Sequence, residues 1–568
     1  MIESKALWEP VLTVLVHAVK PEPHNEIPQG QSAHNNFWDF AFMHQEATHM
    51  ILWVMSDRAI PRSYRMMQGF GVNTYCLVNK EGKRHFVKFH WTPYLGVHSL
   101  VWDEALKLAG QDPDFHRRDL WEAIETGHYP RWKFGIQTIP EEDEDKFDFD
   151  ILDATKVWPE EQVPIRYIGE LELNRNPDNY FAQTEQVAFC TAHVVPGIDF
   201  SDDPLLQGRN FSYFDTQISR LGINWEQLPI NRPVCPVLNV NRDGQGQHTI
   251  HKGTVNYWPN RFDANPPAKN EGFETYPAQV SGIKGRMNSA KFKDYLSQAQ
   301  LFYNSLTPIE QAHVTAALSF ELDHCDDPTV YERLVQRLAD IDLALCQTVA
   351  EKVGGPTPKK VTEPNPGHKA KRLSQLEFMP DKPTIESRRI AILVADGYDP
   401  VSYGRIKAAI QNAGALPFTI APVRQEVKAS DGLDVIIPDH HYKAVRSTMF
   451  DAVFVPDGGH IEALRPNAMA RFWVREAFGH NKPIGSVGKG SLLVEDALSE
   501  AQGIKIARAN NARLTESYGV VSVGRVEPDD TETIDKVLSS FIDTFIGQIS
   551  QHRCWARELE GFSAMVPC

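Results

Sequence analysis

The chain has 568 residues, more than one hydrophobic core accommodates, so we expect about three structural units. Hydrophobic residues make up 42% and charged residues 23%, as in globular proteins, and no run of eighteen apolar residues is present, which excludes a membrane-spanning helix. The net charge of −16, without a basic block, excludes nucleic acid as a partner.

The first predicted elements are strands and a helix. Residues 71–91 predict a β-hairpin, because two alternating runs flank a turn that Gly82 closes. Residues 112–127 begin with an aspartate cap and predict a helix. Residues 165–174 predict a further strand.

Two long proline-rich connections follow, at residues 231–244 and 257–277. Loops of this length inside a compact unit need a structural reason, and wrapping around a neighbouring subunit is one. We therefore expect extended arms that reach a second copy of the chain.

The next region has a helical pattern. Thr307, Pro308 and Glu310 have the spacing of a helix start with a capping box. Helical periodicity then continues through residues 330–354. Residues 354–372 are rich in Pro, Gly and Lys and predict an exposed linker.

The last third alternates between strands and helices. Residues 388–396 and 415–422 predict strands on either side of a helix at 399–414. Two further strand–turn segments follow at 452–459 and 482–490. Such alternation predicts a parallel sheet covered on both faces.

The chemistry of the chain is most apparent in the stretch RNFSYFDTQISRLG, residues 209–222. Arg209 and Tyr213 are four residues apart, so on a helix their side chains meet. A guanidinium next to a phenol favours the charged phenolate, and this hard anionic oxygen favours ferric iron. The alternative is an ordinary pair on a helix surface.

The same stretch resembles the proximal haem motif R-x-F-x-Y-x-D-T of the haem catalases, in which tyrosinate is the axial iron ligand. Further segments resemble the large-subunit members of that family, and the resemblance runs from about residue 17 to the C-terminus. They are HAVKPEPHNEIPQGQSAHNNFWDF, MSDRAIPRSYRMMQGFGVNTYCLVN, DPDFHRRDLWEAIETGHYPRW, IPEEDEDKFDFDILDATK, LNRNPDNYFAQTEQVAF and DDPLLQGR.

The resemblance implies an α+β fold with an antiparallel β-barrel core, a wrapping arm and a helical segment, followed by an α/β flavodoxin-like domain of the DJ-1/PfpI type. The expected boundaries are 1–250 for the barrel core, 251–295 for the arm, 296–353 for the helices, 354–386 for the linker and 387–562 for the C-terminal domain.

The resemblance also implies the activity, which is dismutation of hydrogen peroxide to water and dioxygen in defence against oxidative stress. The implied cofactor is haem b or haem d, with Tyr213 as the iron ligand and Arg209 keeping it deprotonated. Leu205, Ser212 and Gln217 occupy positions that line the haem in the family. The family further implies a homotetramer.

We assign no distal residues in this chain. In the family, a histidine moves a proton between the peroxide oxygens and an asparagine orients the peroxide, and both lie N-terminal to the segments matched here. His17, His24 and His34 are the nearest histidines, but they fall on positions that match other family segments. A shortened gene model and a truncated paralogue would both explain this pattern.

Three alternatives therefore stay open. The first is a haem-binding, catalase-like protein without efficient turnover, and the second is a chain that cannot fold because part of its core is exposed. The third is a DJ-1-type hydrolase or chaperone. The third is disfavoured because Val487 occupies the position of the nucleophilic cysteine, with Gly488 beside it and Asp399 near the acid position. We expect the C-terminal domain to have a packing or stabilising role.

Seven scattered cysteines without a CxxC pattern predict free thiols in a reducing compartment, and we expect the cytoplasm. Cys190 replaces a histidine that some large-subunit members carry close to the proximal tyrosine. We expect a plain buried thiol at this position, with a covalent link to Tyr213 as the alternative.

Overall fold

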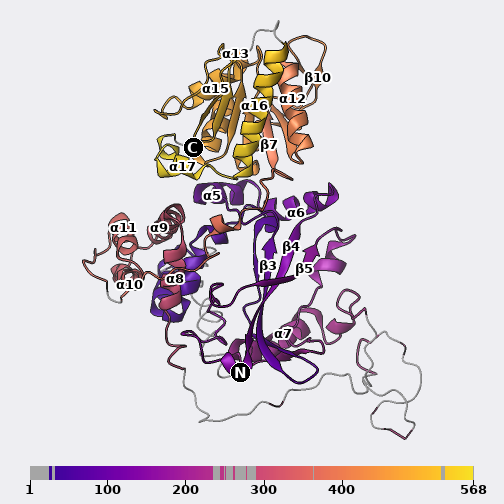
Figure 1. Cartoon of the computed structure of the whole chain (residues 1–568), viewed down its shortest axis with the longest axis vertical. Helices are drawn as coiled ribbons and strands as arrows, with labels where there is room; N and C mark the ends of the chain where they lie inside the picture. Colours follow the sequence, from indigo (N-terminus) through magenta and orange to yellow (C-terminus); the bar gives the residue numbers. More distant parts are fainter. Residues whose placement is uncertain are drawn as a thin grey trace.

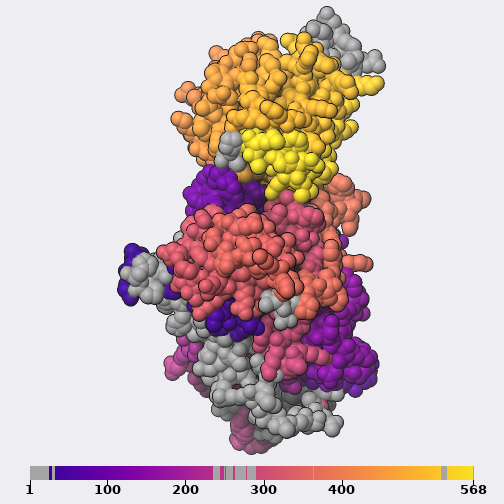
Figure 2. Space-filling model, turned by 90° about the vertical axis from the view of Figure 1, so that its left-hand side faces the viewer, coloured from indigo at the N-terminus to yellow at the C-terminus, as the bar shows by residue number. Residues whose placement is uncertain are grey.

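The computed structural model contains an antiparallel sheet, a helical region and a C-terminal α/β domain (Figure 1). The sheet lies at the centre, with α7 at one end and the C-terminal domain at the other. Figure 2 shows the C-terminal domain resting on the residues near 100 and on the helical region. The structure describes residues 25–27, 32–234, 243–247, 250, 257, 260–261, 277, 289–361, 364–525 and 531–566.

The antiparallel sheet has the strand order β5-β4-β3-β2-β6, and β1 pairs with β3 beside this path. Its strands are β1 (Gly69–Phe70), β2 (Tyr75–Val78), β3 (Arg84–Pro93), β4 (Arg131–Pro140), β5 (Arg166–Glu172) and β6 (Ile198–Phe200). The predicted hairpin is confirmed as β2 and β3, with Gly82 at φ 77° in the turn, and the predicted strand at 165–174 is β5. No described strand joins β5 to β6, so the described strands form half of a barrel.

The described residues before the helical region form five helices. They are α3 (Asn35–Met43), α4 (Thr48–Val54), α5 (Trp102–Gln111), α6 (Phe115–Glu125) and α7 (Pro204–Leu221). The helix predicted at 112–127 is confirmed as α6, but the side chain of Asp114 at its N-cap makes no capping hydrogen bond. Single helical turns connect these elements at η2 (Gln45–Ala47), η3 (Asp57–Ala59), η4 (Tyr64–Met66), η5 (Glu141–Asp143), η6 (Phe181–Glu185) and η7 (Trp225–Gln227).

The helical region consists of α8 (Ser297–Ser305), α9 (Pro308–Leu322), α10 (Pro328–Ala339) and α11 (Leu343–Val353). The helix start at Thr307 is confirmed, since its backbone N–H and its hydroxyl each donate to a Glu310 oxygen at 2.8 Å. The helical periodicity predicted over 330–354 is confirmed as α10 and α11, which are separated by a break at residues 340–342. Asp342 caps a new helix there by accepting from the N–H of Leu345 at 2.8 Å, because aspartate favours a cap over a helix interior.

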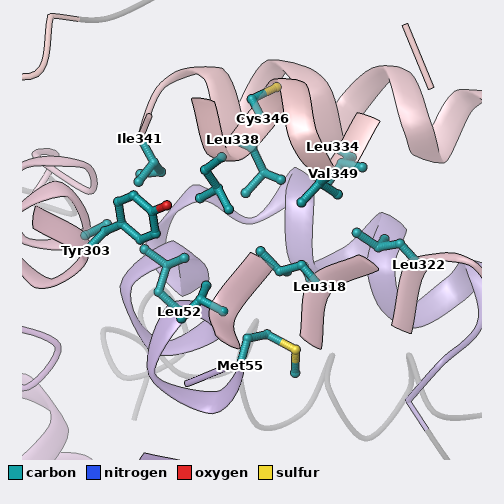
Figure 3. Close-up of a cluster of buried hydrophobic side chains, with 14 of the residues drawn as sticks. Leu52, Met55, Tyr303, Leu318, Leu322, Leu334, Leu338, Ile341, Cys346 and Val349 are labelled. Carbon is teal, nitrogen blue, oxygen red and sulfur yellow. The ribbon is translucent and has the colours of Figure 1, made fainter. Parts of the chain in front are cut away.

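The helical region shares its core with the N-terminal helices. Figure 3 shows Leu52 and Met55 of the α4 segment pointing toward the side chains of α9 and α10. The predicted linker differs from expectation at its end, because Ala370 and Leu373 are buried in this same cluster. Burial of these two apolar side chains fixes the end of the linker against the helices.

The C-terminal domain is a seven-stranded sheet in the order β11-β8-β7-β12-β13-β15-β14. All neighbouring pairs are parallel except β14 and β15, which confirms the predicted parallel sheet. Its strands are β7 (Arg389–Leu393), β8 (Leu416–Ala421), β11 (His440–His441), β12 (Ala452–Val455), β13 (Ile484–Val487), β14 (Thr515–Ser517) and β15 (Val520–Val523), and β9 (Val427–Lys428) pairs with β10 (Val435–Ile436). Its helices are α12 (Pro400–Asn412), α13 (Ile461–Leu464), α14 (Ala468–Gly479), α15 (Gly490–Ala497), α16 (Thr531–Ser550) and α17 (Trp555–Leu559), and the remaining helical turns are η8 (Gln375–Phe378), η9 (Ser447–Met449) and η10 (Ser563–Met565).

Buried ion pairs join the C-terminal domain to the rest of the chain. The Arg62 guanidinium donates to both oxygens of Asp451, at 2.8 and 2.9 Å. Glu104 of α5 pairs with Lys482 at 2.5 Å and with Arg553 at 2.7 Å, and all three side chains are fully buried. A buried pair that loses one partner leaves an uncompensated charge, so these contacts couple the domains tightly.

Candidate active site

Helix α7 carries every residue of the predicted site, and Asp203 fixes its position. The Asp203 carboxylate accepts from the N–H of Leu206 at 3.0 Å, which caps the helix, and from the N–H of Thr74 at 2.8 Å, which ties it to the start of β2. Pro204 occupies the first turn, and Gly222, with φ 104°, follows the last helical residue. The sequence therefore sets both ends of the helix, and Asp203 holds it against the sheet.

The side chains of Arg209 and Tyr213 meet on this helix, as their spacing predicts. The guanidinium carbon of Arg209 lies 4.9 Å from the centroid of the Tyr213 ring, and both residues are half-buried. Within the described part of the chain, neither the guanidinium nor the phenol hydroxyl makes a hydrogen bond or an ion pair. A cation and a phenol are thus available together to a ligand.

The other predicted residues are distributed around this pair. Leu205 and Gln217 lie one turn before Arg209 and one turn after Tyr213, and both are buried. The Gln217 amide donates to the carbonyl of Phe189 at 3.1 Å. Ser212 is exposed, and its hydroxyl donates to the carbonyl of Arg209 at 3.4 Å. Leu205, Arg209, Tyr213 and Gln217 therefore form one row along α7, with Ser212 beside it.

Aromatic rings of the sheet form a wall that the sequence analysis missed. Alternate residues of β3 point to one face, and the Phe89 and Trp91 rings there stack on Phe134 of β4 at 5.9 and 4.3 Å. The ring of Tyr75 on β2 continues the wall at 6.3 Å from Phe89. All four rings are partly exposed. The period-2 alternation of aromatic residues in residues 83–91 is the sequence signal for this wall.

The hydrogen bond from the N–H of Thr74 to Asp203 brings the start of α7 next to Tyr75 of this wall. Burial raises the pKa of Tyr75 to about 12, helped by the negative charge of Asp203 and by the ionisable groups of Tyr213 and Cys190. Tyr75 therefore stays neutral, and its neighbours include the phenol of the candidate ligand. A partly exposed aromatic wall beside a free phenol and a free guanidinium fits a large, flat, anionic cofactor such as haem.

The sequence profile of the catalase family matches residues 11–264, and that of the catalase-related immune-responsive family matches residues 289–353. Catalase A of Emericella nidulans is 63% identical over 562 residues, which are 97% of this chain and 75% of that protein. Catalase-1 of Neurospora crassa is 63% identical over 558 residues, with coverage of 97% and 75%. The chain belongs to the catalase family.

The C-terminal domain assigns it to the large-subunit catalases. The DJ-1/PfpI family profile matches residues 388–508. Catalase HPII of Mycobacterium avium is 46% identical over 557 residues, which are 97% of this chain and 77% of that protein. The expected fold of a catalase core with an appended flavodoxin-like domain is thereby confirmed.

The histidines and the cysteine singled out in the sequence lie as follows in this catalase. His34 is buried near Glu321 of α9, within the helical region, while His17 and His24 lie outside the described residues. Cys190 is a half-buried free thiol close to Tyr75. Much of the predicted arm at 251–295 also falls outside the described residues.

The turn after β13 keeps the sharp geometry of the DJ-1 class. Gly488 has φ 57°, and Val487 before it is buried. The Asp399 carboxylate caps α12 by accepting from the N–H of Ser402 at 2.8 Å, and its backbone N–H donates to the carbonyl of Asp457 at 2.8 Å. Asp457 fills the turn instead and accepts from the N–H of Lys489 at 2.8 Å. The sequence analysis missed Asp457, because only the parallel order of β12 and β13 brings it there.

A cavity of about 430 Å³ lies on the other face of the antiparallel sheet. Lys88 and His90, which line it, are on β3 but alternate with Phe89 and Trp91 of the aromatic wall. Burial lowers the pKa of Lys88 to about 8. This cavity is separate from α7 and contains none of the predicted site residues.

Proposed function

We propose that this catalase binds haem b or haem d, with the phenolate of Tyr213 as the ligand of its iron. The observation that supports this best is the contact between Arg209 and Tyr213, which leaves both groups free for a ligand. Arg209 stabilises the phenolate, and Leu205, Ser212 and Gln217 line the cofactor. When bound, the haem iron supplies the two-electron redox chemistry that hydrogen peroxide dismutation needs.

The activity of the chain is that of the catalases, which convert two molecules of hydrogen peroxide into two of water and one of dioxygen. Identity of 63% over 97% of the chain favours this activity over haem binding without turnover. Arg209 contributes a positive charge next to the phenol ring, which favours the phenolate over the neutral phenol. The aromatic wall excludes water from the same space. We assign the proton-transferring distal role to no residue named in this proposal.

The proposal includes a homotetramer. Apolar side chains are exposed around α7, including Phe189 at 76%, Ile223 at 67% and Phe211 at 66%. Contiguous exposed apolar surface is typical of a covered interface, and a second copy of the chain is the partner that the family implies. We retain the domain boundaries given above as part of this proposal.

The proposal also places the protein in the cytoplasm. None of the cysteines in the described part of the chain forms a disulfide, which is typical of a reducing compartment; they are Cys76, Cys190, Cys325, Cys346 and Cys554. None of the helices in the described ranges is long and apolar enough to span a membrane.

Reconstitution with haemin tests the function. We expect the wild-type chain to give a Soret band on titration with ferric haemin and to retain it after gel filtration. Tyr213→Phe removes the ligand oxygen, so we expect loss of the ferric-phenolate spectrum and of any oxygen evolution from hydrogen peroxide. Tyr129→Phe, at an exposed tyrosine, is the matched control. An unchanged spectrum in Tyr213→Phe would refute the assignment.

A further inference from the structure

A backbone segment runs along α7 on the side of Tyr213. We call residues 185–191 the strap. Arg220 donates to the carbonyls of Glu185 at 2.9 Å and Val187 at 2.7 Å. About one helical turn before Arg220, the Gln217 amide donates to the carbonyl of Phe189 at 3.1 Å. Alternate carbonyls of the strap are therefore hydrogen-bonded to the helix, and the strap runs antiparallel to it.

Asn210 binds the C-terminal end of the strap. The Thr191 hydroxyl donates to the side-chain oxygen of Asn210 at 2.8 Å. Asn210, Gln217 and Arg220 lie at intervals of seven and three residues, so they share one face of the helix. These contacts hold both ends of the strap.

The register of these contacts places Cys190 opposite Tyr213. Tyr213 lies between Asn210 and Gln217 on the helix, three and four residues away, and therefore on the same face. Those two residues bind Thr191 and Phe189, which leaves Cys190 in the intervening position.

Tyr75 ties the strap to the sheet. Its hydroxyl donates to the carbonyl of Thr191 at 3.1 Å, so its single proton is used by the strap. Thr191 thus receives a hydrogen bond from β2 through its carbonyl and gives one to α7 through its hydroxyl. In the described structure, it is the one strap residue that forms hydrogen bonds with a side chain of β2 and with a side chain of α7.

We propose that Thr191 is a positioning residue for the iron ligand Tyr213, because it locks the strap between Asn210 and Tyr75 and so fixes the direction of the phenol. This inference rests on the proposed function. Thr191 acts through its neighbours: it fixes the path of the strap over the ring of Tyr213, which limits the rotation of that side chain. A freely rotating phenol would pay ordering entropy each time it binds iron.

Two substitutions at one position test this inference. Thr191→Val keeps the shape but removes the hydroxyl, whereas Thr191→Ser keeps the hydroxyl. We expect Thr191→Val to speed hydrogen–deuterium exchange of the strap in the haem-free chain, and to weaken haemin binding by about fivefold. Thr191→Ser should behave like the wild type in both measurements. Thr544→Val, which removes a hydroxyl bond within the exposed surface of α16, is the matched control.

The outcomes separate this inference from the proposed function. The positioning role would be overturned if Thr191→Val and Thr191→Ser showed the same hydrogen–deuterium exchange of the strap and the same haemin affinity. The proposed function would still stand in that case if Tyr213→Phe abolished the spectrum. An unchanged spectrum in Tyr213→Phe would overturn both. Tyr75→Phe removes the other bond of Thr191, and we expect it to reproduce the faster strap exchange and weaker haemin binding, so the test does not depend on the folding of one variant.

Discussion

At the scale of single residues, chemistry and spacing combine in Arg209 and Tyr213. Four residues separate them, and any α-helix brings such side chains together. Their 4.9 Å approach therefore needs only that α7 forms. Their freedom from other partners is a separate property, since it depends on which side chains the rest of the fold places nearby.

Replacement of Arg209 tests the charge beside the phenol. Unit charges about 5 Å apart interact by about 3 kcal/mol at an effective dielectric constant near 20, and partial exposure reduces this by screening. We expect Arg209→Gln to bind haemin about tenfold more weakly, measured by titration at the Soret band. Arg117→Gln, at an exposed arginine outside the site, serves as control, and equal affinities of the two variants would contradict the role of Arg209.

Gly488 shows a second effect at the residue scale. A Cβ atom built on it would lie 2.2 Å from the Cγ of Asp457, and its φ of 57° already disfavours a side chain. We expect Gly488→Ala to lower the free energy of unfolding of the C-terminal domain by about 2–4 kcal/mol. The matched control is Gly432→Ala, because Gly432 has φ 70° but open space around it, and it should lose about 1 kcal/mol. Urea denaturation measures the free energy of unfolding of both variants. Equal losses would contradict a steric clash between the new Cβ atom at position 488 and Asp457.

At the scale of elements, the ends of helices were predictable where a short motif determines them. Thr307 and Glu310 form a capping interaction that involves neighbours only three residues apart. The break between α10 and α11 has no comparable sequence signal, because Asp342 lies within a strong helical periodicity and one cap residue carries little weight in such a window. The start of α7 is different again, since Asp203 serves both the helix and the sheet.

Asp203 therefore provides a test of how α7 is held. Asp203→Ala removes the helix cap, worth about 1 kcal/mol, and strands the buried N–H of Thr74, worth about 1–3 kcal/mol. We expect a loss of about 2–4 kcal/mol in the free energy of unfolding. Asp203→Asn keeps an acceptor oxygen and should lose less. Calorimetry compares the two variants, and an equal loss would mean that these hydrogen bonds are not what anchors the helix.

At the scale of the whole molecule, ion pairs between distant parts of the chain hold the domains together. Arg62 and Asp451 are 389 residues apart in the sequence, yet their side chains form a bidentate pair. His313 of α9 lies 2.8 Å from Asp57 and 3.0 Å from Glu558, so it links the helical region to both the core and the C-terminal domain. Contacts of this kind form only when all three regions are correctly placed.

The pH dependence of stability tests the His313 contact. Burial alone would lower the pKa of His313, but the charges of Asp57 and Glu558 raise it to about 10. A raised pKa stabilises the fold through the protonated form, so this contribution is complete below the unfolded pKa of about 6.5 and is lost as pH rises toward 10. Burial raises the pKa of Asp57 and offsets part of the gain, so we expect about 2–4 kcal/mol to be lost over this window.

His313→Gln removes the titrating group, so its melting temperature should be lower at pH 6.5 and change less between pH 6.5 and 10. Melting curves of the wild type and the variant over that range provide the measurement. His324→Gln, at an exposed histidine near the end of the same helix, should follow the wild-type profile. Parallel profiles for the wild type and His313→Gln would exclude His313 as the source of the alkaline loss.

The sequence alone determined the local features of this catalase: the β2–β3 hairpin, the capped start of α9, the strand–helix alternation after residue 388, and the meeting of Arg209 with Tyr213. Helix and strand periods fix which near neighbours share a face, so a few residues suffice. Only the tertiary structure decided that the strap runs along α7, that Asp457 fills the turn at Gly488, and that Arg62 finds Asp451. These contacts join residues dozens to hundreds of positions apart, and the path of the whole chain, which no local pattern encodes, brings them together.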